Sequence, residues 1–170
     1  YAGVTEWADE YDKEFAELLK AAPEYAKSIL ARGRGGKKPR KDFAVWKDVK
    51  PYMSYFYDEL FSKEADIPEG FANEDVKAVF TKFASSYDEN DDNNAWFEKI
   101  KVIGEELGFT SDMKAFRANP ESFKGSVGDV SMFLRIAVTG RTNSPDMHEI
   151  MRILGKERVL DRLEKAAKAL

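Results

Sequence analysis

Residues 134–150 read Leu-Arg-Ile-Ala-Val-Thr-Gly-Arg-Thr-Asn-Ser-Pro-Asp-Met-His-Glu-Ile, and residues 154–160 continue with Leu-Gly-Lys-Glu-Arg-Val-Leu. The first part predicts a helix that runs into Gly140, because glycine readily adopts the positive φ that ends a helix. A short polar turn follows. A new helix is then expected, with Ser144 as its N-cap and Pro145 as its first residue. This helix–turn–helix corner indicates an all-α protein.

The rest of the chain repeats the helical pattern. Apolar residues recur at spacings of three and four, and almost no segment alternates as a half-buried strand would. For example, Val4, Trp7, Tyr11, Phe15 and Leu18 form the apolar stripe of one expected amphipathic helix. We expect helical segments at 4–18, 24–30, 49–60, 73–83, 96–107, 111–117, 127–138, 144–154 and 156–170.

Composition limits the class of protein. The chain has 170 residues, 43% hydrophobic and 13% aromatic, enough to form one domain or two small helical lobes. It has no cysteine, which excludes disulfides and thiolate zinc sites and fits a reducing cytosol. No apolar run approaches the roughly 20 residues that span a bilayer, so we expect a cytoplasmic protein without a membrane partner. The missing initiator methionine indicates a fragment of a longer protein.

Charge is unevenly distributed along the chain, although the net charge is only −4. From residue 27 to residue 50, nine lysines and arginines face two acidic residues. From residue 58 to residue 98, twelve acidic residues face three lysines, and from residue 117 onward ten basic residues face seven acidic ones. The first and last thirds can therefore carry a nucleic-acid footprint. Solvated faces without a ligand would give the same blocks.

Two lobes are expected from this organisation. The first spans residues 1–90 and contains a basic loop at 32–41, where glycines and a proline break the helical pattern. The second spans residues 91–170 and contains the corner at 130–163. The acidic segment 88–92 lies near the expected boundary. It lacks the glycine and the closing glutamate of an EF-hand, so no calcium site is expected there.

The corner offers one candidate binding residue with suitable chemistry. On a helix over residues 127–139, Arg135 lies on an edge beside the buried face. Its planar guanidinium can meet two acceptors on the edge of an unpaired base. Alternatively, Arg135 extends along the apolar surface or pairs with Asp129. Its neighbours on this edge are Gly128, Met132 and Thr139.

The start of the next helix adds to this candidate site. Unpaired amides at a helix N-terminus can hold a phosphate or a base carbonyl. Arg135, Ser144 and Pro145 would then place a guanidinium, a hydroxyl and a flat apolar ring close together. The same residues would also form an ordinary capped helix–turn–helix without a ligand. The second helix carries only Arg152 as a cation, which argues against DNA binding.

Several stretches resemble bacterial glutamyl-tRNA synthetases. The segment Val130–Leu163 is similar to the closing motif of that family. The resemblance covers essentially the whole chain and implies an all-α, two-lobed anticodon-binding region. It further implies the anticodon loop of glutamate tRNA and the catalytic domain of the same parent chain as partners, in a monomer. The other similar stretches are Asp42-Phe-Ala-Val-Trp-Lys-Asp-Val, Tyr55-Phe-Tyr-Asp-Glu-Leu-Phe, Trp96-Phe-Glu-Lys-Ile-Lys and Phe123-Lys-Gly-Ser-Val-Gly-Asp-Val.

The resemblance also implies roles for individual residues. Arg135 matches the arginine that contacts the first anticodon base, and Pro145 matches the adjoining proline. Ser144 stands where some members have threonine, and Met132 stands where some have glutamine. Arg40 or Lys41 is the candidate for the third base, and Lys37 and Lys38 are candidates for backbone phosphates. The RNA-binding set is completed by Thr139 and Arg141 at the corner and by Arg117, which lies near another contacting arginine of the family.

Catalytic motifs of that family are missing from the sequence. Neither the His-Ile-Gly-His-like sequence nor the Lys-Met-Ser-Lys-Ser-like loop for ATP is present. The one histidine, His148, is expected to be structural or solvent-facing, and no nucleophile–base pair or metal cluster is evident. We therefore expect a non-catalytic chain without cofactor, with ATP and magnesium used only by the full-length parent enzyme.

Two alternative functions remain open from the sequence. A helical protein–protein interaction module would use the aromatic residues Trp46, Tyr52, Tyr55 and Phe56 as its contact face. A complete small enzyme is disfavoured by the missing acid–base residues. Salt-insensitive binding to a protein, with no binding to RNA, would support the interaction module.

Overall fold

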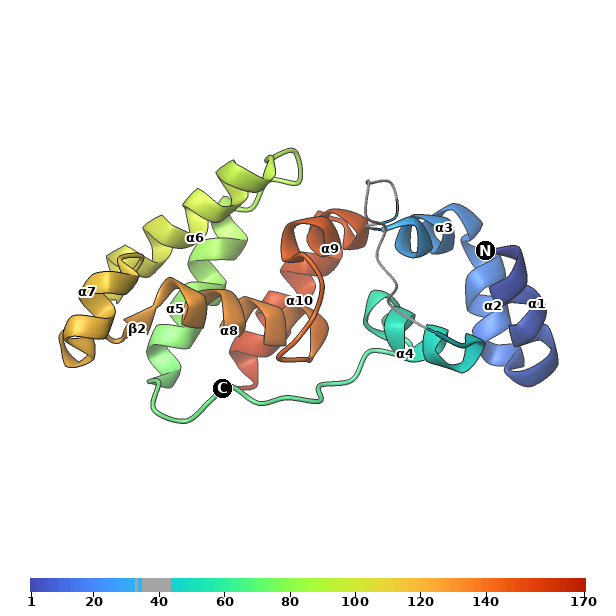
Figure 1. Ribbon diagram of the computed structural model, residues 1–170, viewed down its shortest axis with the longest axis horizontal. Helices are drawn as coiled ribbons and strands as arrows, with labels where there is room; N and C mark the ends of the chain where they lie inside the picture. Colours follow the sequence, from blue (N-terminus) through green and yellow to red (C-terminus); the bar gives the residue numbers. More distant parts are fainter. Residues whose placement is uncertain (33, 35–43) are drawn as a thin grey trace. The chain divides into compact units, whose positions relative to one another are not determined.

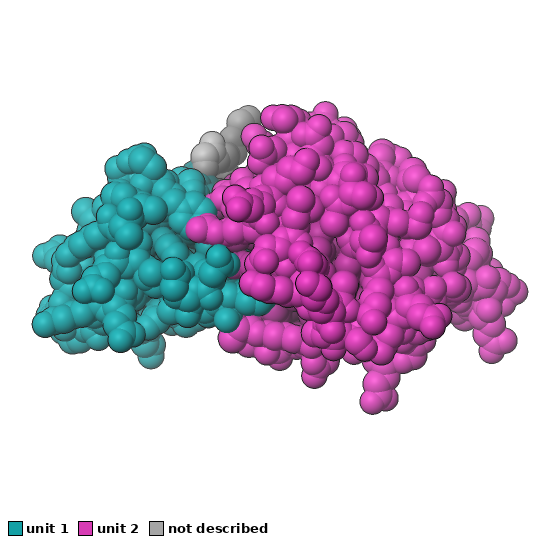
Figure 2. Space-filling model, turned by 180° about the vertical axis from the view of Figure 1, so that it is seen from behind, with its two compact units in different colours: residues 1–61 teal, residues 62–170 magenta. Residues whose placement is uncertain are grey.

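The computed structural model describes residues 1–32, 34 and 44–170, and these residues form an all-α structure (Figure 1). Two compact units are present, Tyr1–Phe61 and Ser62–Leu170 (Figure 2). Lys37, Lys38, Arg40 and Lys41 of the basic loop lie outside the described residues. Within the described part, no helix has both the length and the apolar character needed to cross a membrane.

The first unit begins with three short helices, α1 (Ala2–Tyr11), α2 (Lys13–Ala21) and α3 (Pro23–Ala31). The prediction of one helix over 4–18 is wrong. Asp12 adopts φ −154° and ψ 81°, and its carboxylate accepts a hydrogen bond from Phe15 N at 3.2 Å. An aspartate that bonds the backbone in this way begins a new helix, so the stripe is divided between α1 and α2.

The described part of the first unit continues with three shorter helical segments, η1 (Trp46–Asp48), α4 (Val49–Met53) and η2 (Ser54–Phe56). Phe56 is fully buried and Tyr55 is 3% exposed, so both belong to the core. The expected contact face for a protein partner is therefore wrong for these two residues, although Trp46 remains 48% exposed. Tyr25 holds the end of η2 by donating its hydroxyl to Phe56 O at 2.6 Å.

The second unit is built around α8 (Val127–Thr139), which contacts α5 (Asn73–Ser86), α6 (Asn93–Leu107) and α10 (Lys156–Lys168). Between α6 and α8 lie β1 (Phe109–Thr110), α7 (Met113–Ala118), η3 (Pro120–Ser122) and β2 (Gly125–Ser126). The two strands pair in parallel, Phe109 with Gly125 and Thr110 with Ser126. The helix α9 (Met147–Leu154) lies between α8 and α10 in the chain.

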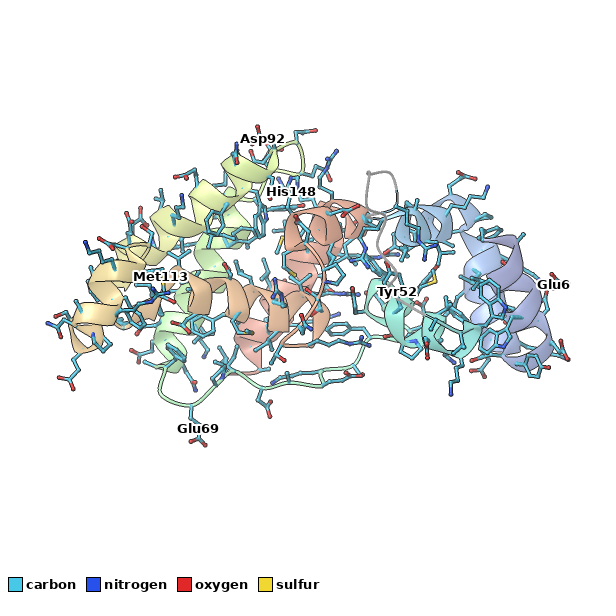
Figure 3. All side chains as sticks on the ribbon, in the orientation of Figure 1. Glu6, Tyr52, Glu69, Asp92, Met113 and His148 are labelled. Carbon is cyan, nitrogen blue, oxygen red and sulfur yellow. The ribbon has the colours of Figure 1, made fainter. Side chains whose placement is uncertain are left out.

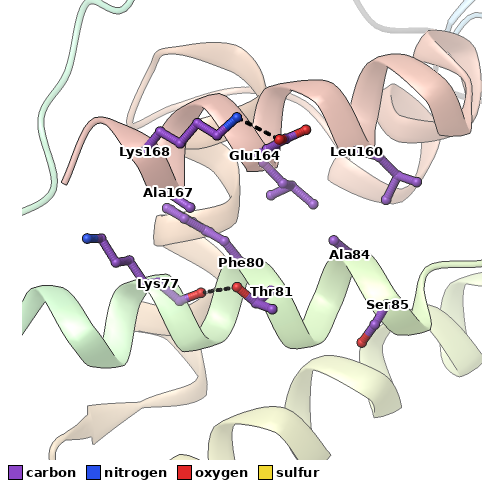
Figure 4. Close-up of a pocket in the computed structure, with 10 residues that line it drawn as sticks. Lys77, Phe80, Thr81, Ala84, Ser85, Leu160, Glu164, Ala167 and Lys168 are labelled. Carbon is purple, nitrogen blue, oxygen red and sulfur yellow. Dashed lines mark hydrogen bonds and ion pairs between the residues drawn. The ribbon is translucent and has the colours of Figure 1, made fainter.

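The buried face expected for α8 is confirmed. Val127, Val130, Leu134 and Val138 are each at most 5% exposed. Between them, α5 and α10 line a groove of about 610 Å³ (Figure 4). Apolar side chains such as Phe80 and Leu163 line the groove, and an ion pair between Lys168 and Glu164 at 2.7 Å lies along its rim.

The compact units divide between Phe61 and Ser62, whereas the sequence pattern predicts a boundary after residue 90. The reason is that α5 packs against α6, so both helices belong to the second unit.

The acidic segment between them is a tight connection. Asp88 accepts a hydrogen bond from Asn90 N at 2.9 Å, and Asp92 caps α6 by accepting from Ala95 N at 2.8 Å.

Candidate nucleic-acid interface

The corner between α8 and α9 has the predicted turn at Gly140. This glycine has φ 72°, and its N–H donates to Ile136 O at 2.8 Å. Its carbonyl accepts hydrogen bonds from Glu64 N at 2.8 Å and Ala65 N at 2.9 Å. A Cβ at Gly140 would lie 2.3 Å from Ser62 O. Only glycine fits this position, because residues 62–65 are bonded directly to the turn.

The start of α9 differs from the sequence prediction. Asp146 is the N-cap, and α9 begins at Met147 rather than at Pro145. The Asp146 carboxylate accepts from His148 N at 2.8 Å and from Glu149 N at 3.3 Å. The amides expected to bind a phosphate or a base carbonyl are thus partly occupied by the protein itself. Ser144 instead donates its hydroxyl to Pro145 O at 2.9 Å.

Arg135 is half-buried on the last full turn of α8. Its Nε atom is buried without a hydrogen-bond partner, and no carboxylate pairs with it in the part of the chain that the structure describes. The alternative pairing with Asp129 is excluded. Asp129 caps the other end of α8, where it accepts from Ser126 N at 2.7 Å and from the Ser126 hydroxyl at 3.1 Å.

The structure joins Arg135, Thr139 and Arg141 in one hydrogen-bonded unit. The Thr139 hydroxyl donates to Arg135 O at 2.7 Å and accepts from Arg141 N at 3.2 Å. Because Thr139 is fully buried, its expected direct contact with RNA is wrong and it shapes the turn instead. Arg141 pairs with Glu64 at 3.4 Å. Met132, Ser144 and Pro145 are half-buried, as Arg135 is.

This arrangement can present a guanidinium, a thioether, a hydroxyl and a proline ring beside a turn that is hydrogen-bonded to residues 64 and 65. Residues 14–167 match the protein family described as anticodon binding domain. The chain belongs to this family. The resemblance drawn from the sequence is thereby confirmed, as is the all-α fold class.

The anticodon-binding domain is similar to bacterial proteins named glutamate–tRNA ligase. It is 43% identical over 167 residues to that of Sorangium cellulosum, which covers 97% of this chain and 29% of the relative. It is 39% identical to those of Acetivibrio thermocellus and Clostridium perfringens, again over 97% of this chain and over 30% and 31% of the relatives. The chain spans about three tenths of the length of these relatives.

Arg117 lies apart from the corner of the anticodon-binding domain. It is exposed in the last turn of α7, which contacts β2, the strand that leads into the N-terminal end of α8. The corner is at the other end of this 13-residue helix, about 20 Å away at 1.5 Å per residue. In Figure 3, Met113 on α7 and His148 on α9 lie in separate parts of the second unit.

Two buried arginines of the anticodon-binding domain were not singled out by the sequence. Arg162 of α10 is 4% exposed, and its Nη1 donates to Val138 O at 2.7 Å. Arg32, counted within the basic loop, is 2% exposed, with its guanidinium carbon 4.9 Å from the centre of the Tyr52 ring. The sequence signal for Arg162 was its place between the stripe residues Val159 and Leu163, where a cation is unusual.

His148 has the structural role expected from the sequence. Its Nε2 atom lies 2.6 Å from Asp91 O, and its ring centre lies 6.1 Å from that of Trp96. These contacts hold α9 against the start of α6. Asp91 in turn forms an ion pair with Lys99.

Proposed function

We propose that this domain reads the anticodon loop of glutamate tRNA and thereby supports glutamylation by the catalytic part of a glutamate–tRNA ligase. The observation that carries the proposal is Arg135. Among the described residues it has no carboxylate partner, and it lies half-buried beside a turn held by backbone hydrogen bonds, in a chain of the anticodon-binding family. The similarity to glutamate–tRNA ligases supports the choice of tRNA.

The chemistry of the corner fits unpaired bases. An arginine fork can donate two parallel hydrogen bonds to a base edge, and an anticodon loop exposes such edges. Arg135 and Ser144 would contact the first anticodon base, and the ring of Pro145 would pack against it. Met132 lies one helical turn before Arg135 and would pack against the middle base where some relatives have a polar side chain.

The basic loop would supply the remaining contacts. Lys37, Lys38, Arg40 and Lys41 would bind backbone phosphates, with Arg40 or Lys41 reaching the third base. Phosphate contacts supply affinity without sequence information, so these lysines and the corner have separable roles. Arg117 would make an independent contact, because it lies on α7, which contacts the strand before the N-terminal end of α8.

The other properties of the parent enzyme follow from the same proposal. ATP and magnesium would be used by the catalytic part, which is the second partner of this domain. We expect a monomer that acts in the cytoplasm, where tRNA is charged.

The test is a titration of the chain with a glutamate anticodon stem–loop and with a loop altered only at its three central bases. Arg135→Ala should cost about 1–3 kcal/mol toward the cognate loop and reduce discrimination. Arg152→Ala is the matched control, because it removes the same charge from an exposed position on α9. It should weaken binding to both loops equally and leave their ratio unchanged.

Equal losses on both loops for Arg135→Ala would overturn the assignment of this residue. A wild-type chain that binds the two loops equally would overturn the proposed function itself. Circular dichroism of each variant establishes that the helices are intact, so a loss of discrimination is not a loss of fold.

A further inference from the structure

Arg162 combines burial with a positive charge at the C-terminal end of α8. Its side chain is 4% exposed, and its Nη1 donates to Val138 O at 2.7 Å. That carbonyl belongs to the last turn of the helix, where backbone carbonyls have no partner within the helix. Burial of a guanidinium is unfavourable unless it is hydrogen-bonded, so a buried arginine at this position indicates a specific structural role.

The carbonyl held by Arg162 lies within the turn that presents Arg135. The Thr139 hydroxyl bonds Arg135 O at 2.7 Å, and Arg141 N bonds the same hydroxyl at 3.2 Å. Val138 lies between these bonded positions. A donor on its carbonyl therefore fixes the backbone from Arg135 to Arg141. The positive charge is also favourable at this end of the helix dipole.

We propose that Arg162 is a positioning residue for anticodon reading: it holds the last turn of α8 so that Arg135 is presented in one orientation. Arg162 does this without touching RNA, because its side chain is buried. Recognition of a base edge requires donor positions held to within about 0.5 Å, which a frayed helix end does not provide. The inference rests on the proposed function, since it names a further residue of the same site.

The experiment compares Arg162→Met and Arg162→Lys in the 170-residue chain. The readout is the ratio of affinities for the cognate stem–loop and the loop altered at its three central bases. Arg162→Met should lower this ratio about tenfold, because it removes the hydrogen bond from a charged donor. Arg162→Lys should lower it about threefold, because an ammonium can still bond Val138 O but lacks the planar fork.

Leu163→Ala is the control for lost stability. Leu163 is the next residue on α10 and is 1% exposed, so the variant should melt at a lower temperature than the wild type. Its discrimination ratio should stay at the wild-type value, because the Arg162 hydrogen bond is intact. All variants are measured at a temperature where circular dichroism shows each of them folded.

A wild-type ratio in both Arg162 variants would overturn the positioning role. An equal loss in Leu163→Ala would also overturn it, because the effect would then be one of general stability. If Arg162→Met does not fold, Arg162→Lys decides by the same criterion. A wild-type chain that fails to distinguish the two loops would remove the proposed function, an outcome that is visible before any variant is made.

Discussion

At the scale of single residues, Gly140 and Gly108 have similar backbones but different surroundings. Both end a helix in the left-handed region, with φ 72° and ψ 10° at Gly140 and φ 93° and ψ 14° at Gly108. A Cβ at Gly140 would lie 2.3 Å from Ser62 O, whereas the nearest atom to one at Gly108 is Cδ of the flexible Lys124 side chain, at 3.4 Å. Gly108→Ala should cost about 1 kcal/mol of backbone strain. Gly140→Ala should cost at least about 3 kcal/mol, because the overlapping atom is backbone. Urea unfolding of both variants measures the difference.

The two substitutions are chemically identical, so the difference between their losses of stability measures the effect of the surrounding atoms. Equal losses of stability in the two variants would show that residues 62–65 can move away from the added methyl group at little cost and do not hold the turn in place. The larger loss at Gly140 would show that the bonds from Glu64 N and Ala65 N to Gly140 O hold the segment in place.

Asp12 gives a pH-dependent prediction at the same scale. A hydrogen bond from Lys50, at 2.5 Å, lowers the pKa of this carboxyl below its ordinary value. A lowered folded-state pKa means that the ion pair stabilises the protein above the unfolded-state pKa, near about 3.9, and is lost as the pH falls through the folded-state pKa. Below about pH 5, the melting temperature of Asp12→Asn should therefore fall less steeply with decreasing pH than that of the wild type.

Asparagine is the suitable replacement because it caps helices nearly as well as aspartate. The start of α2 is thereby retained while the charge is removed. Lys50→Met removes the other partner of the ion pair, and its melting temperature should also fall less steeply over this pH range. An acid profile in Asp12→Asn as steep as that of the wild type would contradict this account.

At the scale of elements, the structure distinguishes between two candidate N-caps of α9, Asp146 and Ser144. Asp146 accepts hydrogen bonds from His148 N and Glu149 N, whereas the Ser144 hydroxyl bonds Pro145 O. Asp146→Ala should therefore destabilise the chain by about 1 kcal/mol. Ser144→Ala should change stability by less than about 0.5 kcal/mol, as a substitution outside a cap does. The reverse order in thermal melts would restore Ser144 as the cap.

Helix boundaries were less predictable than the faces of helices. The period of Val130, Leu134 and Val138 identified the buried face of α8, because burial selects side chains at helical spacing. The break at Asp12 and the start at Asp146 depend on which carboxylate bonds which amide, a choice among neighbouring candidates that hydrophobic periodicity does not record. The strands β1 and β2 have two residues each, too few for an alternating pattern.

At the scale of the whole molecule, the charge distribution predicts how RNA binding depends on salt. The net charge is −4, yet residues 27–50 carry nine basic and two acidic residues. Each phosphate contact releases counterions, so Lys37→Ala should weaken binding to cognate and altered loops alike and lower the salt slope by about one. Lys114→Ala, a lysine outside the basic segment, is the control and should leave the slope unchanged. A slope that Lys37→Ala does not alter would place the phosphate contacts elsewhere.

The candidate site was predictable only in part. Arg135 and Gly140 could be found from the sequence because the residues that identify them are local: a cation beside a buried face and a glycine at a helix end. Arg162 could not be assigned its role. It lies 24 residues from Val138, and only the packing of α10 against α8 brings the two together.

The amino-acid sequence by itself determined the helical class, the buried face of α8, the turn at Gly140 and the membership of the anticodon-binding family. These properties depend on residues at most a few positions apart, or on motifs read directly from the chain. Only the tertiary structure decided that α5 and α6 belong to one unit, that Thr139 is inside the protein, and that residues 64, 65 and 162 bond the carbonyls of Gly140 and Val138 at the corner. The physical reason is that burial and hydrogen bonding between distant segments are set by how helices pack, and sequence spacing does not specify that packing.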